Sequence, residues 1–262
     1  MNMSTPSTKQ PTSTYQPYKP GAQVNILGVP FDPVTMSDMK QVILTYSRTR
    51  TTHNLFIVTA NPEIVHYAAE TPSYNSLICN ADYIIPDGTG VVKAAKLLGT
   101  PLPERVPGIE VMERCLEIAQ QEGLRVFLLG ATDEVVKRAV QNIQNKYPKS
   151  EVKGHHGFAS LDDTAVVDEI RAFQPDFIFV GMGYPKQEQW IQQHRNHFEH
   201  TLMMGVGGSI DVFSGTVKRA PRIWRKLNLE WLYRILKDVK RIKRSHRIPK
   251  FVWAVLKQKM KK

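Results

Sequence analysis

The sequence predicts an α/β domain in which a parallel sheet is covered by helices on both faces. Between Val24 and about Gly215, short apolar runs alternate with segments whose apolar residues recur at helical spacing. The apolar runs contain few polar residues, which is typical of strands buried on both faces of a parallel sheet. Four of the runs lead directly into loops rich in glycine and polar residues, at the edge where parallel sheets bind ligands.

The predicted elements follow one another closely along the chain. Strands are expected at 54–60, 81–88, 125–131, 176–183 and 201–208, and helices at 62–70, 108–123, 133–148 and 162–175, with a further helix beginning at 185. Pro62 suits the first turn of its helix, where no intrahelical hydrogen bond from its nitrogen is needed. Gly123 predicts the end of the helix that begins at residue 108. The repeated order of strand, loop and helix is typical of an α/β domain.

Composition excludes several protein classes. The chain has 262 residues, of which 42% are hydrophobic and 23% charged, so a wholly disordered or fibrous protein is excluded. No apolar run approaches the ~18–20 residues of a membrane-spanning helix. Residues 1–22 are rich in Ser, Thr, Pro and Gln and are expected to form a disordered leader. This leader lacks the apolar segment of a signal peptide, so a cytoplasmic protein is expected.

The distribution of charged residues divides the chain after the leader into two parts, 23–215 and 216–262. The second part holds 17 of the 35 Lys and Arg residues but only two acids, Glu230 and Asp238, whereas the first 215 residues carry more acids than bases. We therefore expect an α/β catalytic domain followed by a basic helical appendage. Such asymmetry points to a polyanionic partner, which is a phosphate-bearing substrate, an anionic membrane surface or a nucleic acid.

Four loops at strand ends are candidates for an anion site: 59–63, 86–90, 181–188 and 205–211. None matches the dinucleotide fingerprint GxGxxG, and the chain has no GxxxxGK[ST] phosphate loop. Backbone N–H groups in glycine-rich turns can nevertheless bind phosphate. Substrate contacts are also expected at Gly130, Gly157, Gly181, Gly183, Pro185, Lys186, Gly207 and Gly208.

Three polar residues near these loops each have two interpretations. Asp87, directly after an apolar strand, is either a carboxylate facing the ligand or a turn aspartate that bonds its own backbone. Asn61 is either a site residue or, as we favour from spacing alone, the N-cap of the next helix. Arg105 is either an anion clamp or an ordinary surface residue.

Metal-dependent and nucleophilic chemistry are not expected. The chain has no Asp-x-Asp pair and no GxSxG elbow, and its histidines lack metal-ligand spacing; the adjacent His155 and His156 are expected in a turn. Cys79 and Cys115 match no zinc or redox spacing and are expected to be buried free thiols.

The basic appendage contains a helical pattern over 228–243, on which Arg234, Arg241 and Arg244 share one side. Further on, Phe251, Trp253 and Leu256 alternate with lysines. Such a segment suits the surface of an anionic membrane, and a basic solvated helix packed on the body is the alternative. No helix-turn-helix, RNA-recognition or zinc-finger pattern is present, so a nucleic-acid partner is not expected.

Six motifs in register make a family resemblance visible. They are TANPEIV, ADYIIPDGTGVV, RVPGIEVME, VFLLGA, FVGMGYPKQE and MMGVGGSIDVFSG. Together they resemble the WecG/TagA/CpsF glycosyltransferase family over roughly residues 24–245, and in particular its TagA/TarA branch in Gram-positive wall teichoic acid synthesis. The resemblance implies a Rossmann-like GT-E fold with a membrane-contacting C-terminal appendage.

The same resemblance implies a reaction. N-acetylmannosamine would pass from UDP-ManNAc to the 4-hydroxyl of GlcNAc-diphospho-undecaprenol, with inversion and without a metal or other cofactor. The protein would then be peripheral on the inner face of the membrane. The oligomeric state, including a homo-oligomer, is left open.

The resemblance also assigns roles to residues. Asp87 matches the general base, and Thr59 and Asn61 match a polar pair beside it. Gln187 matches a sugar-positioning glutamine, Arg105 matches a cation near the diphosphate, and Phe158 and Asp211 match the uridine contacts. The appendage cations that close over the site are matched by Arg234, Arg241 and Arg244. Two alternatives remain, namely a relative that uses another UDP-sugar such as N-acetylmannosaminuronic acid, and a nucleotide-sugar sensor or nucleic-acid-binding module.

Overall fold

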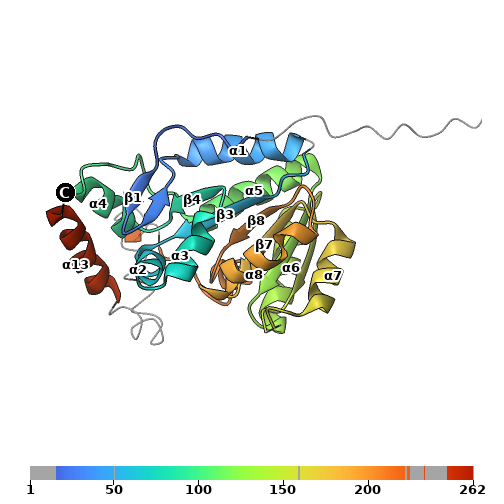
Figure 1. Ribbon diagram of the computed structural model, residues 1–262. Coiled ribbons are helices and arrows are strands. Elements are labelled where there is room, and N and C mark those ends of the chain that lie inside the picture. The colour runs from blue at the N-terminus through green and yellow to red at the C-terminus, as the bar shows by residue number, and fades with distance from the viewer. Residues whose placement is uncertain are drawn as a thin grey trace, which may run out of the picture.

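A six-stranded parallel sheet forms the centre of the protein, shown as a computed structural model in Figure 1. The structure describes residues 16–49, 51–158, 160–221, 223–224, 233 and 247–261. The strands, in spatial order, are β4 (Tyr83–Pro86), β3 (Leu55–Ala60), β8 (Leu202–Gly205), β7 (Phe177–Gly181), β5 (Arg125–Gly130) and β6 (Glu151–His155). All five neighbouring pairs are parallel, which confirms the predicted fold class.

Helices cover both faces of this sheet, as predicted. One face is packed by α1 (Met36–Arg48), α5 (Gly108–Glu122) and α6 (Asp133–Lys146). The other is packed by α2 (Pro62–Glu70), α3 (Pro72–Cys79), α4 (Thr89–Leu97), α7 (Thr164–Phe173) and α8 (Lys186–His194). Successive residues of each central strand contribute to opposite cores; in β3, Phe56 and Val58 face one side while Leu55 and Ile57 face the other. This two-sided burial explains the apolar runs.

The register of the sheet brings strand ends level at one edge. Thr59 and Ala60 of β3 pair with Ile85 and Pro86 of β4, so the loops after these strands leave the sheet together. On the other side of β8, Gly130 of β5 pairs with Gly181. The carboxyl ends that carry the conspicuous loops therefore form one continuous edge, where a ligand can touch several of them.

An antiparallel hairpin of β1 (Val24–Ile26) and β2 (Val29–Phe31) precedes the sheet. Asp32, which is fully buried, accepts a hydrogen bond from the Ile84 backbone N–H and forms an ion pair with Lys19 at 2.7 Å. The Lys19 ammonium also lies 4.5 Å from the Tyr83 ring centroid. Part of the segment expected to be a disordered leader thus lies on the domain, because a buried carboxylate needs this cation.

Several elements were not predicted. Strand β6 is at the edge of the sheet with Glu151 and Lys153 exposed, so its sequence lacks an apolar run.

The expectation of a turn at both histidines is wrong, since β6 ends at His155. The expectation that Cys79 is buried is also wrong: α3 buries Tyr74 and Ile78, and the next residue points outward. Cys115 is buried, as expected.

The described part of the basic appendage includes the helix α13 (Arg247–Met260), which packs on α2 and α4 at one end of the molecule (Figure 1). Phe251 and Val255 are buried, whereas Trp253 is 58% exposed and Met260 73% exposed. Of the three apolar residues considered for a membrane contact, Phe251 instead anchors the helix to the body, whereas Trp253 and Leu256 are exposed. No helix in the described part of the chain is both long and apolar enough to cross a membrane.

Candidate active site

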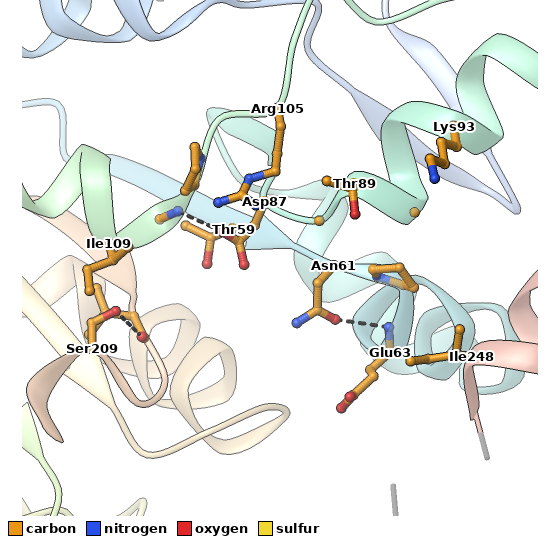
Figure 2. Close-up of a pocket in the computed structure, with 16 residues that line it drawn as sticks. Thr59, Asn61, Glu63, Asp87, Thr89, Lys93, Arg105, Ile109, Ser209 and Ile248 are labelled. Atoms are coloured by element: carbon orange, nitrogen blue, oxygen red, sulfur yellow. Dashed lines mark hydrogen bonds between the residues drawn. The ribbon is translucent and has the colours of Figure 1, made fainter. Parts of the chain in front are cut away.

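A cavity of about 300 Å³ opens at the carboxyl ends of β3 and β4 (Figure 2). Its lining includes Thr59, Asn61, Asp87 and Arg105, which are four of the five residues expected to act in catalysis. These residues come from the end of β3 and the loop after it, the loop after β4 and the loop before α5, and the parallel register of β3 and β4 brings the first two regions together. The sheet therefore assembles one polar site from distant parts of the sequence.

Asp87 is held by the backbone on both sides. Its N–H donates to the carbonyl of Ala60 at 3.1 Å, and its carboxylate Oδ1 accepts from the N–H of Gly108 at 2.8 Å. This bond to the first residue of α5, 21 residues away, differs from the self-contained turn considered above. The carboxylate lines the cavity in a fixed orientation, as a proton acceptor requires.

Asn61 both caps α2 and lines the cavity. Its Oδ1 accepts from the N–H groups of Glu63 at 2.9 Å and Ile64 at 3.1 Å, so it is the N-cap of α2, as favoured from spacing. Because the carbonyl oxygen is used in the cap, the amide nitrogen is the end of the side chain turned toward Asp87 in Figure 2. Capping thus orients an N–H donor toward the cavity.

Thr59 and Arg105 complete this part of the lining. The Thr59 hydroxyl donates to the carbonyl of Gly205 at 2.9 Å, which ties the end of β3 to the turn after β8. Arg105 is half-buried and extends its guanidinium into the space above Asp87 and Thr59 in Figure 2. Of the two interpretations of Arg105, the position in the cavity favours an anion clamp.

Gln187 does not line this cavity. It is 3% exposed; its Oε1 accepts from the Gly207 N–H at 3.0 Å, and its Nε2 donates to Glu188 at 2.6 Å. Gln187 therefore supports the turn after β8 from the protein interior and not from the cavity. The family resemblance implied a sugar-positioning glutamine here, but α8 turns this side chain toward the turn after β8.

The glycines of the expected substrate site allow strand ends to approach closely. A Cβ on Gly130 would lie 2.6 Å from the Gly181 backbone, and one on Gly157 would lie 2.8 Å from Gly130. A Cβ on Gly181 would meet Ile210 at 2.6 Å. Any side chain at these three positions would force the loops apart, so here glycine is required by packing.

The other expected substrate contacts lie along the same edge but outside the cavity lining. Phe158 is 75% exposed after β6, and Asp211 is half-buried in α9 (Ser209–Phe213). Gly183 and Gly207 have left-handed backbones, with φ of 77° and 49°, whereas Gly208 is the N-cap residue of α9, and Pro185 and Lys186 begin α8. Arg234, Arg241 and Arg244 lie outside the described residues.

A comparison with known protein families bears on this arrangement. The model of the Glycosyl transferase WecG/TagA/CpsF family matches residues 24–262. The chain belongs to the WecG/TagA/CpsF glycosyltransferase family. The match covers the α/β domain and continues beyond the limit near residue 245 expected from the motifs, so α13 lies within the matched length.

Curated relatives extend this finding. The N-acetylglucosaminyldiphosphoundecaprenol N-acetyl-beta-D-mannosaminyltransferase of Staphylococcus aureus strain MW2 is 55% identical over 240 residues, covering 92% of this chain and 94% of the relative. The protein of the same name from strain MRSA252 is 54% identical with the same coverage. The similarity therefore spans the site and the appendage together.

Lys93 and Ile248 are among the cavity residues of this WecG/TagA/CpsF member that were missed from the sequence. Lys93, on α4, lines the cavity one helical turn after Thr89, so recognition of α4 as a helix would have revealed it. Ile248 also lines the cavity, brought there by the packing of α13. No local sequence pattern indicates Ile248, because its position depends on contacts with a distant part of the chain.

The first turn of α13 is fixed at the cavity by aromatic residues. The Arg247 guanidinium donates to Tyr184 Oη and lies 5.8 Å from the ring centroids of both Tyr184 and Tyr67. Tyr184 Oη also donates to Glu63 of the cavity lining, at 3.4 Å. In this family member the appendage is thus connected to the α2 wall of the site.

Proposed function

We propose that this protein transfers N-acetylmannosamine from UDP-ManNAc to the 4-hydroxyl of GlcNAc-diphospho-undecaprenol, forming the β-1,4 linkage unit of wall teichoic acid in a Gram-positive cell. The observation that carries the proposal is a backbone-anchored carboxylate, Asp87, in a cavity that also contains Arg105 and Lys93. The relatives are named for this acceptor and this transferase activity, and their similarity extends over nearly the whole chain.

Asp87 acts in this proposal as the general base of a single displacement. Its carboxylate takes the proton of the acceptor 4-hydroxyl while that oxygen attacks the anomeric carbon of the donor sugar. The bond from the anomeric carbon to UDP breaks on the opposite face, which inverts the configuration. The Gly108 N–H orients the carboxylate, and the Asn61 amide donates to a sugar oxygen nearby.

Charge develops on the UDP diphosphate as this bond breaks, and cations must stabilise it. The proposal assigns this role to Arg105 and to the appendage arginines Arg234, Arg241 and Arg244, with the glycine turns after β7 and β8 providing N–H donors. The protein then needs no cofactor, so turnover should be unaffected by EDTA. Loss of turnover in EDTA that Mg²⁺ restores would contradict this assignment.

The lipid of the acceptor requires the protein to reach the inner leaflet of the membrane. We include in the proposal a peripheral contact made by α13, which is supported by the exposed Trp253, Val252 and Met260 beside Lys257 and Lys259. Apolar side chains next to lysines suit the interface of an anionic bilayer.

The experiment compares donors on one water-soluble, short-chain analogue of GlcNAc-diphospho-undecaprenol. Radiolabelled UDP-ManNAc should yield a disaccharide product, whereas UDP-GlcNAc and UDP-N-acetylmannosaminuronic acid should yield little. Faster transfer from the uronic acid donor would establish the alternative sugar specificity. Binding of UDP-sugars without any product would instead favour a sensor.

A further inference from the structure

Glu188 is a buried carboxyl group that the proposed reaction does not use. It is the third residue of α8, and its side chain is fully buried behind the turn that follows β8. One oxygen, Oε1, accepts from Gln187 Nε2 at 2.6 Å. The other, Oε2, has no hydrogen-bond partner among the described residues. Burying a carboxyl group costs free energy, so its retention in the core needs a reason.

The contacts of Glu188 lead to the wall of the cavity. An amide side chain has one donor end and one acceptor end, so a bond from Gln187 Nε2 to Glu188 points the Gln187 oxygen away from Glu188. That oxygen accepts from the Gly207 N–H at 3.0 Å. Val206 and Ser209, within two residues of Gly207, line the cavity, and the Gly205 carbonyl accepts from Thr59.

Space around this turn is tightly limited. A Cβ on Gly205 would lie 2.6 Å from Gln187 Nε2 and 3.1 Å from Glu188 Oε1. The turn therefore rests directly on the two side chains, and a reversed Gln187 amide would present N–H groups to the N–H of Gly207. Such a reversal would lose the bond that fixes the turn.

A tyrosine faces Glu188 from the neighbouring helix. Tyr74, on α3, is buried, and the Glu188 charge adds to the desolvation that raises the Tyr74 pKa. The Tyr74 hydroxyl and Glu188 Oε2 are both buried without a hydrogen-bond partner among the described residues. A bond between these two groups would leave Oε1 available to Gln187.

We propose that Glu188 is a positioning residue: its carboxyl oxygen orients the Gln187 amide, which holds the Gly205–Gly208 turn in place against the cavity. Glu188 touches no substrate in this role. The inference rests on the proposed function for its kinetic readout only, because the state of the turn can be measured without turnover.

A double-mutant cycle tests whether Glu188 acts through Gln187. Glu188→Ala and Gln187→Ala should each lower kcat for transfer from UDP-ManNAc by about 10-fold or more, since small displacements at a site cost up to ~100-fold. In the Gln187→Ala background, Glu188→Ala should cost less than about 2-fold more. Glu188→Gln keeps an oxygen for Gln187 Nε2 and should retain at least half of the activity.

Hydrogen–deuterium exchange provides the second readout. Glu188→Ala should speed amide exchange at 205–208, whereas Glu188→Gln should leave it unchanged. The matched control is Asp82→Asn, at the opposite end of the sheet, where the carboxylate accepts from the Phe56 N–H. This variant should leave exchange at 205–208 unchanged.

The outcomes separate this inference from the proposed function. Multiplicative losses in the cycle, or unchanged exchange at 205–208 in Glu188→Ala, would overturn the positioning role. A wild-type protein that transfers no N-acetylmannosamine would overturn the proposed function, while exchange would still decide the role of Glu188. If Glu188→Ala does not fold, a Glu188→Gln variant with altered exchange at the turn would likewise overturn it.

Discussion

Replacing Glu188 by glutamine should change how the stability of the protein depends on pH. Burial raises the pKa of Glu188 from 4.5 to about 7, against the opposing effect of the hydrogen bond from Gln187. Tyr74 is the titratable group that faces it from α3, and the β7 and β8 segments beneath α8 contain none. Between these two pKa values the folded protein binds a proton that the unfolded chain has released. Stability therefore falls as pH rises through this window.

The size of the effect follows from the two pKa values. Between pH 5 and pH 8, this single ionisation should lower the free energy of unfolding by about 2 to 3 kcal/mol. Glutamine has the same shape and no ionisation, so Glu188→Gln should lack this part of the decrease. The comparison uses the pH dependence of each variant, because constant differences in packing cancel there.

Urea unfolding at the two pH values measures the effect. Glu169→Gln is the matched control, because Glu169 is an exposed carboxylate on α7 and its replacement should leave the wild-type pH dependence unchanged. An equal loss of stability in wild type and Glu188→Gln would refute the claim that Glu188 is a buried, ionising group.

Three further predictions concern the cap, the thiols and the appendage. Asn61→Asp should keep the cap of α2 and the stability while lowering kcat, whereas Asn61→Ala should also lose about 1 kcal/mol in urea unfolding; equal kcat for wild type and Asn61→Asp would contradict the amide's role. A thiol reagent should modify one cysteine, Cys79, in the native protein and both after denaturation, since Cys115 is buried with a raised pKa; two native thiols would contradict this burial. Neutralising the lysines at 257, 259, 261 and 262 should weaken co-sedimentation with anionic vesicles at about 1 kcal/mol per charge while sparing activity on a soluble acceptor; unchanged co-sedimentation would exclude this contact.

Burial determined which parts of the fold were predictable. Strands buried on both faces leave apolar runs, so β3, β4, β5, β7 and β8 were recognised. Strand β6 was missed because half of its residues face solvent, and α4 was missed because its short amphipathic pattern follows the 86–90 loop without a break. Neither element changes the fold class, but α4 carries Lys93 of the cavity.

The site was partly predictable for a related reason. Parallel strands end at one edge, so polar residues after β3 and β4 were expected to meet, and Asp87, Asn61 and Thr59 do so. The support behind the turn after β8 was not predictable, because Glu188 is buried by the packing of α8 against α3 and the sheet. Ile248 was likewise placed by a helix that packs from the far end of the chain.

The central claim is that Asp87 is the base for sugar transfer, and the single-turnover rate of Asp87→Asn tests it most directly. Asparagine keeps an oxygen for the Gly108 N–H, so the loop and UDP-ManNAc binding should be unchanged by calorimetry. The rate on a saturating soluble acceptor should fall by about 10²–10⁴-fold, as general-base loss does. A variant that binds the donor normally and retains more than half of the wild-type rate would contradict the claim.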